Sequence, residues 1–165
     1  MLFHVSEDPT IAEFVPRPSK YTDDPVVWGI DAERLRNYLV PRDCPRVTYD
    51  AGPDTVAADV QRFLGSSRAV VAVEANWWNR IQSCRLYIYR LPAATFQCID
   101  ACAGYFVSRE RVRPESVEVT DDPIAALLAR RVEVRILPEI ETLRQAVVAS
   151  TLRFSVIRMC NAIVR

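Results

Sequence analysis

Strand-type and helix-type segments follow one another along this chain in an irregular order. Short apolar and β-branched segments predict strands at residues 2–5, 25–30, 47–49, 68–73, 85–91, 105–108, 112–119 and 132–137. Capping residues and apolar spacing predict helices at residues 31–39, 55–64, 123–130 and 138–149. Because this order lacks the regular strand–helix–strand alternation of a doubly wound fold, the sequence predicts the α+β class. We expect a single domain over residues 1–165, with a mixed curved β-sheet, flanking helices, and the first strand central or next to a cleft.

The charge balance and the length of the apolar runs exclude several classes of protein. The chain has 165 residues, of which 21 are basic and 21 acidic, so its formal net charge is zero. A neutral chain is not expected to bind nucleic acid broadly, although a local arginine patch would still grip a phosphate group. The longest apolar run is the six residues Ile124–Ala129, far too short for a membrane span. We therefore expect no membrane partner, and the sequence gives no oligomeric state.

The five cysteines indicate a reducing compartment. Their odd number, their wide spacing and the absence of an export signal at the start predict free thiols in a cytoplasm. Cys98 and Cys102 are four residues apart, but two thiols without a second pair make a poor zinc site. We expect both to be small core residues and no metal to be bound.

Several nucleotide-binding and catalytic motifs are missing. The four glycines are too far apart for a glycine-rich dinucleotide turn or a phosphate-binding P-loop. With His4 as the one histidine, any histidine-based chemistry must use that residue, and a two-histidine metal site is impossible.

Two segments carry residues suited to chemistry. His4 and Ser6 project to the same side of the first strand, and His4 is either a functional group or a histidine bonded to a neighbouring carbonyl. If residues 105–114 stay extended, Arg109, Arg111 and Arg113 share one face and Glu110 lies on the other. The guanidinium charges would then keep Glu110 ionised, as an electrostatic stabiliser requires. The alternative is an exposed glutamate in a surface ion pair.

The aromatic residues offer stacking surfaces as well as core packing. Trp28 alternates with Val26 and Ile30, and Tyr38 lies on the apolar side of its predicted helix, so both fit a core. Residues 74–80 form a second polar and aromatic cluster directly after a buried strand, with Trp77 and Trp78 at its centre.

The opening Leu2-Phe3-His4-Val5-Ser6-Glu7 carries a specific resemblance, together with Val26-Val27-Trp28-Gly29-Ile30-Asp31 and Pro41-Arg42-Asp43-Cys44-Pro45. Residues 104–110 and 149–152 also fit it. The chain resembles a family of small bacterial proteins without an established function, over nearly its whole length.

A looser similarity implies a specific chemistry. A first strand with histidine and a small hydroxyl residue, a second strand that leads into a helix with aromatics, and a late Ser-x-Glu are typical of ADP-ribosyltransferase-like proteins and RNA 2′-phosphotransferases. Many members hold NAD with a histidine, an aromatic residue and a glutamate. The resemblance implies His4 and Glu110 as the catalytic pair and either Trp28 or Tyr38 as the aromatic residue.

Those roles suit cleavage of the nicotinamide–ribose bond. A carboxylate stabilises the oxocarbenium-like transition state, and an aromatic face stacks on the nicotinamide ring. Arg17 or Arg109 would bind the pyrophosphate, with Ser6 beside the histidine.

Two function classes follow from this resemblance. The chain is either a transferase or hydrolase that uses NAD or a related ADP-ribose compound as its substrate, or a non-catalytic module for a nucleotide, an RNA end or another protein. For both we expect His4 and Glu110 to face one concave surface, with Trp28 or Tyr38 in its wall. No cofactor beyond NAD as a substrate is implied.

Overall fold

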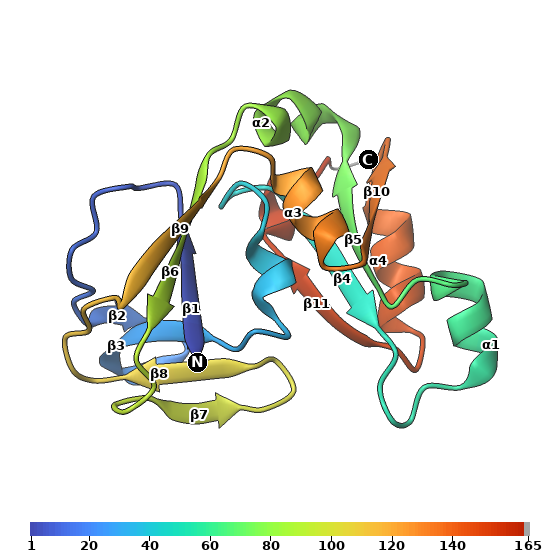
Figure 1. The fold of residues 1–165 in the computed structure, drawn as a ribbon. Helices are drawn as coiled ribbons and strands as arrows, with labels where there is room; N and C mark the ends of the chain where they lie inside the picture. Colours follow the sequence, from blue (N-terminus) through green and yellow to red (C-terminus); the bar gives the residue numbers. More distant parts are fainter. Residues whose placement is uncertain (164–165) are drawn as a thin grey trace. The chain divides into compact units, whose positions relative to one another are not determined.

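A computed structural model describes residues 1–163, which contain eleven β-strands and four α-helices (Figure 1). The predicted α+β class is confirmed. The chain divides into two compact units, each made from two separate stretches of sequence. The first unit comprises residues Met1–Tyr38 and Arg85–Asp121, and the second comprises Leu39–Cys84 and Asp122–Arg165. Within residues 1–163, no helix is long and apolar enough to cross a membrane.

The first unit is built on a seven-stranded antiparallel sheet with the order β7-β8-β3-β1-β6-β9, and β2 pairs with β3 beside this path. The first strand is central, as expected. The strands are β1 (Leu2–Ser6), β2 (Arg17–Ser19), β3 (Thr22–Ile30), β6 (Leu86–Leu91), β7 (Gln97–Asp100), β8 (Tyr105–Ser108) and β9 (Ser116–Thr120). One core cluster lies on this sheet, around Leu2, Phe14 and Tyr89.

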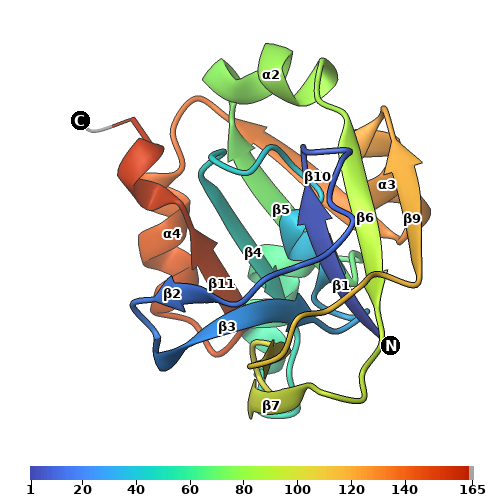
Figure 2. The same ribbon diagram turned by 90° about the vertical axis from the view of Figure 1, so that its left-hand side faces the viewer.

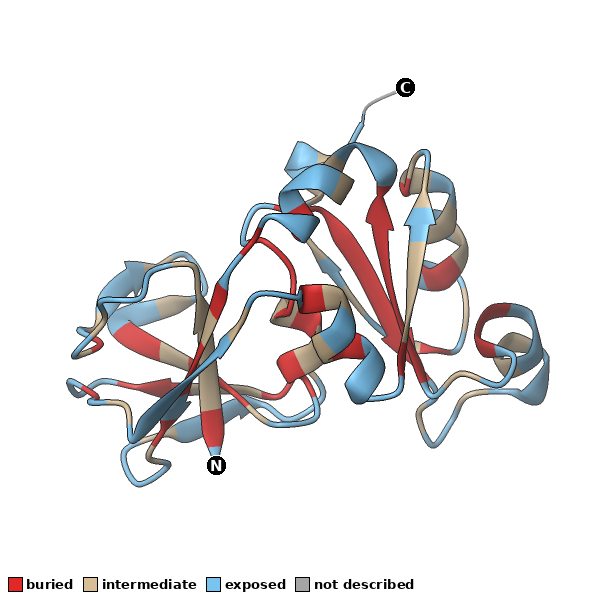
Figure 3. Ribbon diagram, turned by 45° about the horizontal axis from the view of Figure 1, so that its top comes forward, coloured by how far each residue is buried: buried red, intermediate tan, exposed pale blue. Residues whose placement is uncertain are grey.

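The second unit has a four-stranded mixed sheet with the order β10-β5-β4-β11, in which β10 runs parallel to β5 and the other pairs are antiparallel. The strands are β4 (Arg46–Asp50), β5 (Ala69–Glu74), β10 (Val132–Leu137) and β11 (Arg153–Ile157). Both central strands are buried along their whole length, as Figure 3 shows. Buried on both faces, a strand reads as a continuous apolar run, which is why residues 68–73 were predictable.

The second unit also contains short helices. They are α1 (Ala57–Asp59), which continues as a π-helical turn over Val60–Leu64, α2 (Trp78–Gln82), α3 (Pro123–Ala129) and α4 (Glu141–Val148). Figure 2 shows α4 alongside β11, and the two elements contact each other. Phe63 and Val147 from these helical segments, and Ile140 directly before α4, enter the same core cluster as Val47 and Val70 of the sheet.

Some predicted elements differ from the observed ones. The predicted helix 31–39 is a turn followed by a 3-10 helix over Leu35–Tyr38, and it ends before Pro41. The predicted strand 112–119 begins at Ser116, after Pro114. The described strands form two sheets instead of the expected single one, and the sheet of the second unit is the mixed one. Among the described strands and α-helices, four were not predicted: β2, β7, α2 and β11.

Candidate functional site

The register of the first unit's sheet divides the predicted site residues between two faces. Phe3 of β1 lies opposite Ile30 of β3, so these two side chains share a face. Trp28 is two residues from Ile30 and shares that face, whereas His4 is one residue from Phe3 and projects to the other. We call these the Trp28 face and the His4 face.

On the His4 face, the imidazole is used by the fold. His4 Nδ1 lies 3.1 Å from the carbonyl oxygen of Trp28, to which it donates. The His4 ring also packs against Phe14, with 4.8 Å between ring centroids. Phe14 is held in turn by two backbone hydrogen bonds with Val112, of 2.8 and 2.9 Å. The carbonyl bond expected of a structural histidine is therefore present, and a functional role of His4 stays a prediction.

Ser6, the hydroxyl residue on the same side as His4, also has a local partner. Its Oγ accepts the backbone N–H of Asp8 at 3.1 Å. The carbonyl of Asp8 accepts the hydroxyl of Tyr89 at 2.6 Å. Ser6 therefore helps to shape the turn after β1.

The arrangement expected around Glu110 is not found, because β8 ends at Ser108 and the chain does not stay extended. Arg109 forms an ion pair with Asp24, at 2.9 Å, whereas Arg111 and Arg113 both bind Glu13. These two arginines lower the pKa of Glu13 through hydrogen bonds. The common face expected for the three guanidiniums depended on an extended chain, and the chain bends at Arg109 and Glu110.

Glu110 itself is exposed, and its backbone amide donates to Ser108 Oγ at 3.2 Å. That His4 and Glu110 share a concave surface stays a prediction.

The Trp28 face carries a cluster of four aromatic side chains, which we call the Trp28 patch: Tyr21, Trp28, Tyr38 and Tyr105. Trp28 lies edge-to-face with Tyr105, at 5.6 Å between centroids and an interplanar angle of 85°. Trp28 also lies edge-to-face with Tyr21, at 6.4 Å between centroids and an interplanar angle of 86°. Tyr38 reaches the same group through its hydroxyl, which donates to the Tyr105 hydroxyl at 3.0 Å.

The sequence positions these rings by local devices. Asp31 follows β3 and caps the next turn, because its Oδ1 accepts the amide of Arg34 at 2.7 Å. This turn leads into the 3-10 helix that carries Tyr38. Gly104 has a φ of +66° directly before Tyr105, and its carbonyl accepts the Asp31 amide at 3.1 Å. The cap and the glycine together place the Tyr38 side chain next to that of Tyr105.

The Trp28 patch remains open to ligands. Tyr21 is 73% exposed, and Trp28, Tyr38 and Tyr105 are half-buried. A core aromatic residue would be covered more fully, so these rings offer surface that a ligand can use.

Two cations border the Trp28 patch. Arg17 lies opposite Val26, which shares the face of Trp28, and the Lys20 ammonium sits 5.0 Å from the centroid of the Tyr21 ring. Among residues 1–163, neither Arg17 nor Lys20 forms an ion pair. By contrast, Arg109 is already bound to Asp24. The positive charge available beside the patch comes from Arg17 and Lys20.

The predicted site residues are thus only partly brought together. Trp28, Tyr38 and Arg17 gather at one patch, and both aromatic alternatives of the sequence contact the same tyrosine. The prediction that Trp28 lines one wall with His4 is wrong, because β-strand alternation sends their side chains to opposite faces. Tyr21, Lys20 and Tyr105 were missed. The placement of the one lysine beside an aromatic residue, in the turn between β2 and β3, was the available signal.

In the cluster at residues 74–80, in the second unit, Glu74 has a structural role. Glu74 is fully buried at the end of β5, and its carboxylate accepts the backbone amides of Ile140 at 3.3 Å and Ile163 at 3.1 Å. Nearby, burial raises the pKa of the Cys44 thiol to about 12, which keeps it protonated and unreactive at neutral pH.

Neither exposed cysteine of the first unit forms part of a metal site. Cys98 and Cys102 are exposed, so the expectation that they are core residues is wrong. Cys98 lies on the edge strand β7, where a small side chain points away from the core. Among the described residues 1–163, no group of three or more histidine, cysteine, aspartate or glutamate side chains is arranged to hold a metal ion.

A comparison with protein-family models identifies the family of the chain. The model of DUF6886, a family of unknown function, matches residues 3–162. The chain belongs to the DUF6886 family. No curated protein and no solved structure matches this DUF6886 chain. The sequence resemblance to a family without an established function is confirmed, whereas the looser similarity to ADP-ribosyltransferases has no further support.

Proposed function

We propose that the first unit is a binding module for a nucleotide, with NAD+ as the compound that fits it best. The observation that carries this proposal is the partly exposed Trp28 patch, bordered by two cations that have no ion-pair partner among residues 1–163. A flat aromatic surface beside positive charge is complementary to a ligand that joins a planar ring to a phosphate group.

The ring is the first element of the fit. The nicotinamide ring of NAD+ is a planar cation, and the face of tryptophan attracts cations more strongly than any other side chain. Tyr105 and Tyr21 stand nearly perpendicular to Trp28, at 85° and 86°. Perpendicular rings of this kind can surround a flat cationic group on more than one side.

The phosphates are the second element. Arg17 presents a planar guanidinium fork that matches two phosphate oxygens, and Lys20 adds a point charge. Because both are exposed, their contribution falls as the salt concentration rises. The ring contributes the part of the affinity that does not depend on salt.

The paired hydroxyls of Tyr38 and Tyr105 are the third element. Each phenol both donates and accepts, so the pair retains hydrogen-bonding capacity after the 3.0 Å bond between them is formed. A carboxamide, which carries one acceptor and two donors, can use that capacity.

We favour binding over catalysis because of where the acidic and basic groups lie. Cleavage of the nicotinamide–ribose bond needs a carboxylate beside the ribose, and Asp24 is committed to Arg109 while Asp31 caps a turn. His4 projects to the opposite face. Incubation with NAD+ should therefore release no free nicotinamide, and release at a rate that depends on Glu110 would favour the enzyme instead.

Calorimetric titration with NAD+ tests the binding proposal. Loss of one stacked ring costs about 1–3 kcal/mol, so Trp28→Leu should weaken binding roughly 5- to 150-fold. Arg17→Ala should weaken it less, and only at low salt. Trp78→Leu, in the second unit, is the matched control and should bind as the wild type does. Equal affinity of Trp28→Leu and wild type would contradict the proposal, as would tighter binding of NADH, whose reduced ring is neutral.

A further inference from the structure

The strand β10 ends the second unit's sheet with one side unpaired. In the sheet order β10-β5-β4-β11, β10 is bonded to β5, and no other described strand pairs with it (Figure 1). An edge strand of this kind presents a row of backbone donors and acceptors to another strand. Its six residues are long enough for a regular ladder.

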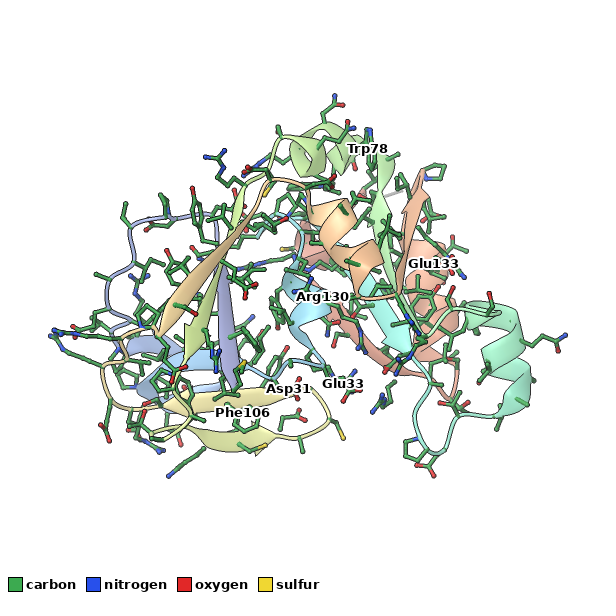
Figure 4. All side chains as sticks on the ribbon, in the orientation of Figure 1. Asp31, Glu33, Trp78, Phe106, Arg130 and Glu133 are labelled. Carbon is green, nitrogen blue, oxygen red and sulfur yellow. The ribbon has the colours of Figure 1, made fainter. Side chains whose placement is uncertain are left out.

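The side chains of β10 alternate between charged and apolar along this edge. Glu133, which Figure 4 labels, and Arg135 project to one side because strand residues alternate. Val132, Val134 and Ile136 project to the other side, where Val134 is half-buried and Ile136 is 43% exposed. The edge therefore leaves apolar surface that a partner strand would cover.

We infer that β10 pairs antiparallel with β10 of a second copy of this chain, about a two-fold axis at Val134. In this register Glu133 of each copy lies opposite Arg135 of the other. On the second side, Val132 lies opposite Ile136, and the two Val134 side chains meet at the axis. The strand is thus complementary to itself in charge and in apolar contact, as a symmetric interface requires.

The charged side chains of β10 are already fixed by hydrogen bonds within one chain. Arg135 donates to Glu133 Oε1 at 2.6 Å, to the Tyr49 hydroxyl at 2.8 Å and to the Phe63 carbonyl at 2.6 Å. Ser67 donates to the other oxygen of Glu133. Because these bonds fix both side chains before association, little conformational entropy is lost when the partner's charges arrive.

The strands at the other sheet ends are less suited to self-pairing. A two-fold axis at the centre of β9 would place Glu118 opposite Glu118, and like charges directly opposite are destabilising. The centre of β11 would place Arg153 opposite Ile157, and β7 would place Gln97 opposite Asp100. Charge complementarity among the described sheet ends therefore favours β10.

Light scattering over a range of protein concentrations tests this inference. The wild-type mass should rise from 18.8 kDa toward twice that value as concentration increases. Val134→Glu and Val134→Lys each place two like charges at the axis, so each variant alone should keep the monomer mass. An equimolar mixture of the two should recover the dimer, because glutamate then meets lysine. Val156→Glu, on the opposite edge strand β11, is the control and should dimerise as the wild type does.

Three results would overturn the inference: a wild type that keeps the monomer mass at every concentration, Val134 variants that dimerise alone, or a mixture of folded variants that stays monomeric. Circular dichroism shows whether each variant is folded. If a charge at the half-buried Val134 prevents folding, Ile136→Glu at its more exposed neighbour replaces it. This variant should bind itself at least tenfold more weakly than the wild type, and unchanged dimerisation would count against β10.

Discussion

His4 lies where the pairing of two central strands ends. Phe3 is opposite Ile30 in the ladder, and one residue further the imidazole donates to the Trp28 carbonyl at 3.1 Å. The ring thus supplies a hydrogen bond that the backbone of β1 does not make. The bond fixes the backbone of Trp28, while the Trp28 side chain lies on the face opposite to His4.

We predict that His4→Ala destabilises the protein by about 1–3 kcal/mol, because a partly buried carbonyl loses its donor. His4→Asn should recover part of this loss, since its amide nitrogen can occupy a position close to that of Nδ1. Urea denaturation measures both variants. NAD+ affinity should be unchanged in the folded fraction, and a stable His4→Ala variant that no longer binds would show that the histidine is functional instead.

Tyr49 gives a pH-dependent prediction. Burial raises the pKa of its hydroxyl from 10.0 to about 12. The unfolded chain therefore loses this proton more easily, so the contribution of Tyr49 to stability is full below pH 10 and is lost as pH rises toward 12. Tyr49→Phe lacks this dependence. Its free energy of unfolding should fall less steeply than that of the wild type above pH 10, and equal slopes would contradict the assignment.

At the scale of elements, the local sequence at the start of α3 was sufficient to predict where this helix begins. Asp122 accepts the amide of Ala125 at 2.8 Å, and Pro123 occupies the first helical turn, as the sequence predicted. Asp122→Ala should therefore cost about 0.5–2 kcal/mol in thermal unfolding. The neighbouring Asp121→Ala removes only an exposed ion pair with Arg85 and should cost at most about 1 kcal/mol. A larger effect at Asp121 would count against the cap.

The elements that escaped prediction share a physical cause. All four residues of β7 are exposed, so no burial pattern marks it as a strand. In β2 the three residues Arg17-Pro18-Ser19 carry no strand signal of their own, and pairing with β3 alone makes them extended. The site shows the same limit. Trp28 and Tyr38 were identifiable from the chain, but their common contact with Tyr105 depends on strand register, which alternation within one strand cannot specify.

At the scale of the whole molecule, the chain passes three times between the two units, at residues 38–39, 84–85 and 121–122. Neither unit is a continuous segment, so neither can be completed before distant parts of the chain have come together. We predict a single cooperative unfolding transition, with equal calorimetric and van't Hoff enthalpies, as for one domain. Two resolved transitions would contradict this prediction.

The most direct test of the nucleotide-binding account is the fluorescence of Trp28 alone. The chain has three tryptophans, so Trp77→Phe with Trp78→Phe leaves Trp28 as the one indole emitter. Titration of this variant with NAD+ should change its emission saturably, and the change should reverse when NAD+ is removed. A Trp28→Phe, Trp77→Phe variant, in which Trp78 emits, should show no saturable change. If Trp28 emission does not respond to NAD+, or if Trp78 responds equally, the Trp28 patch is not the nucleotide site.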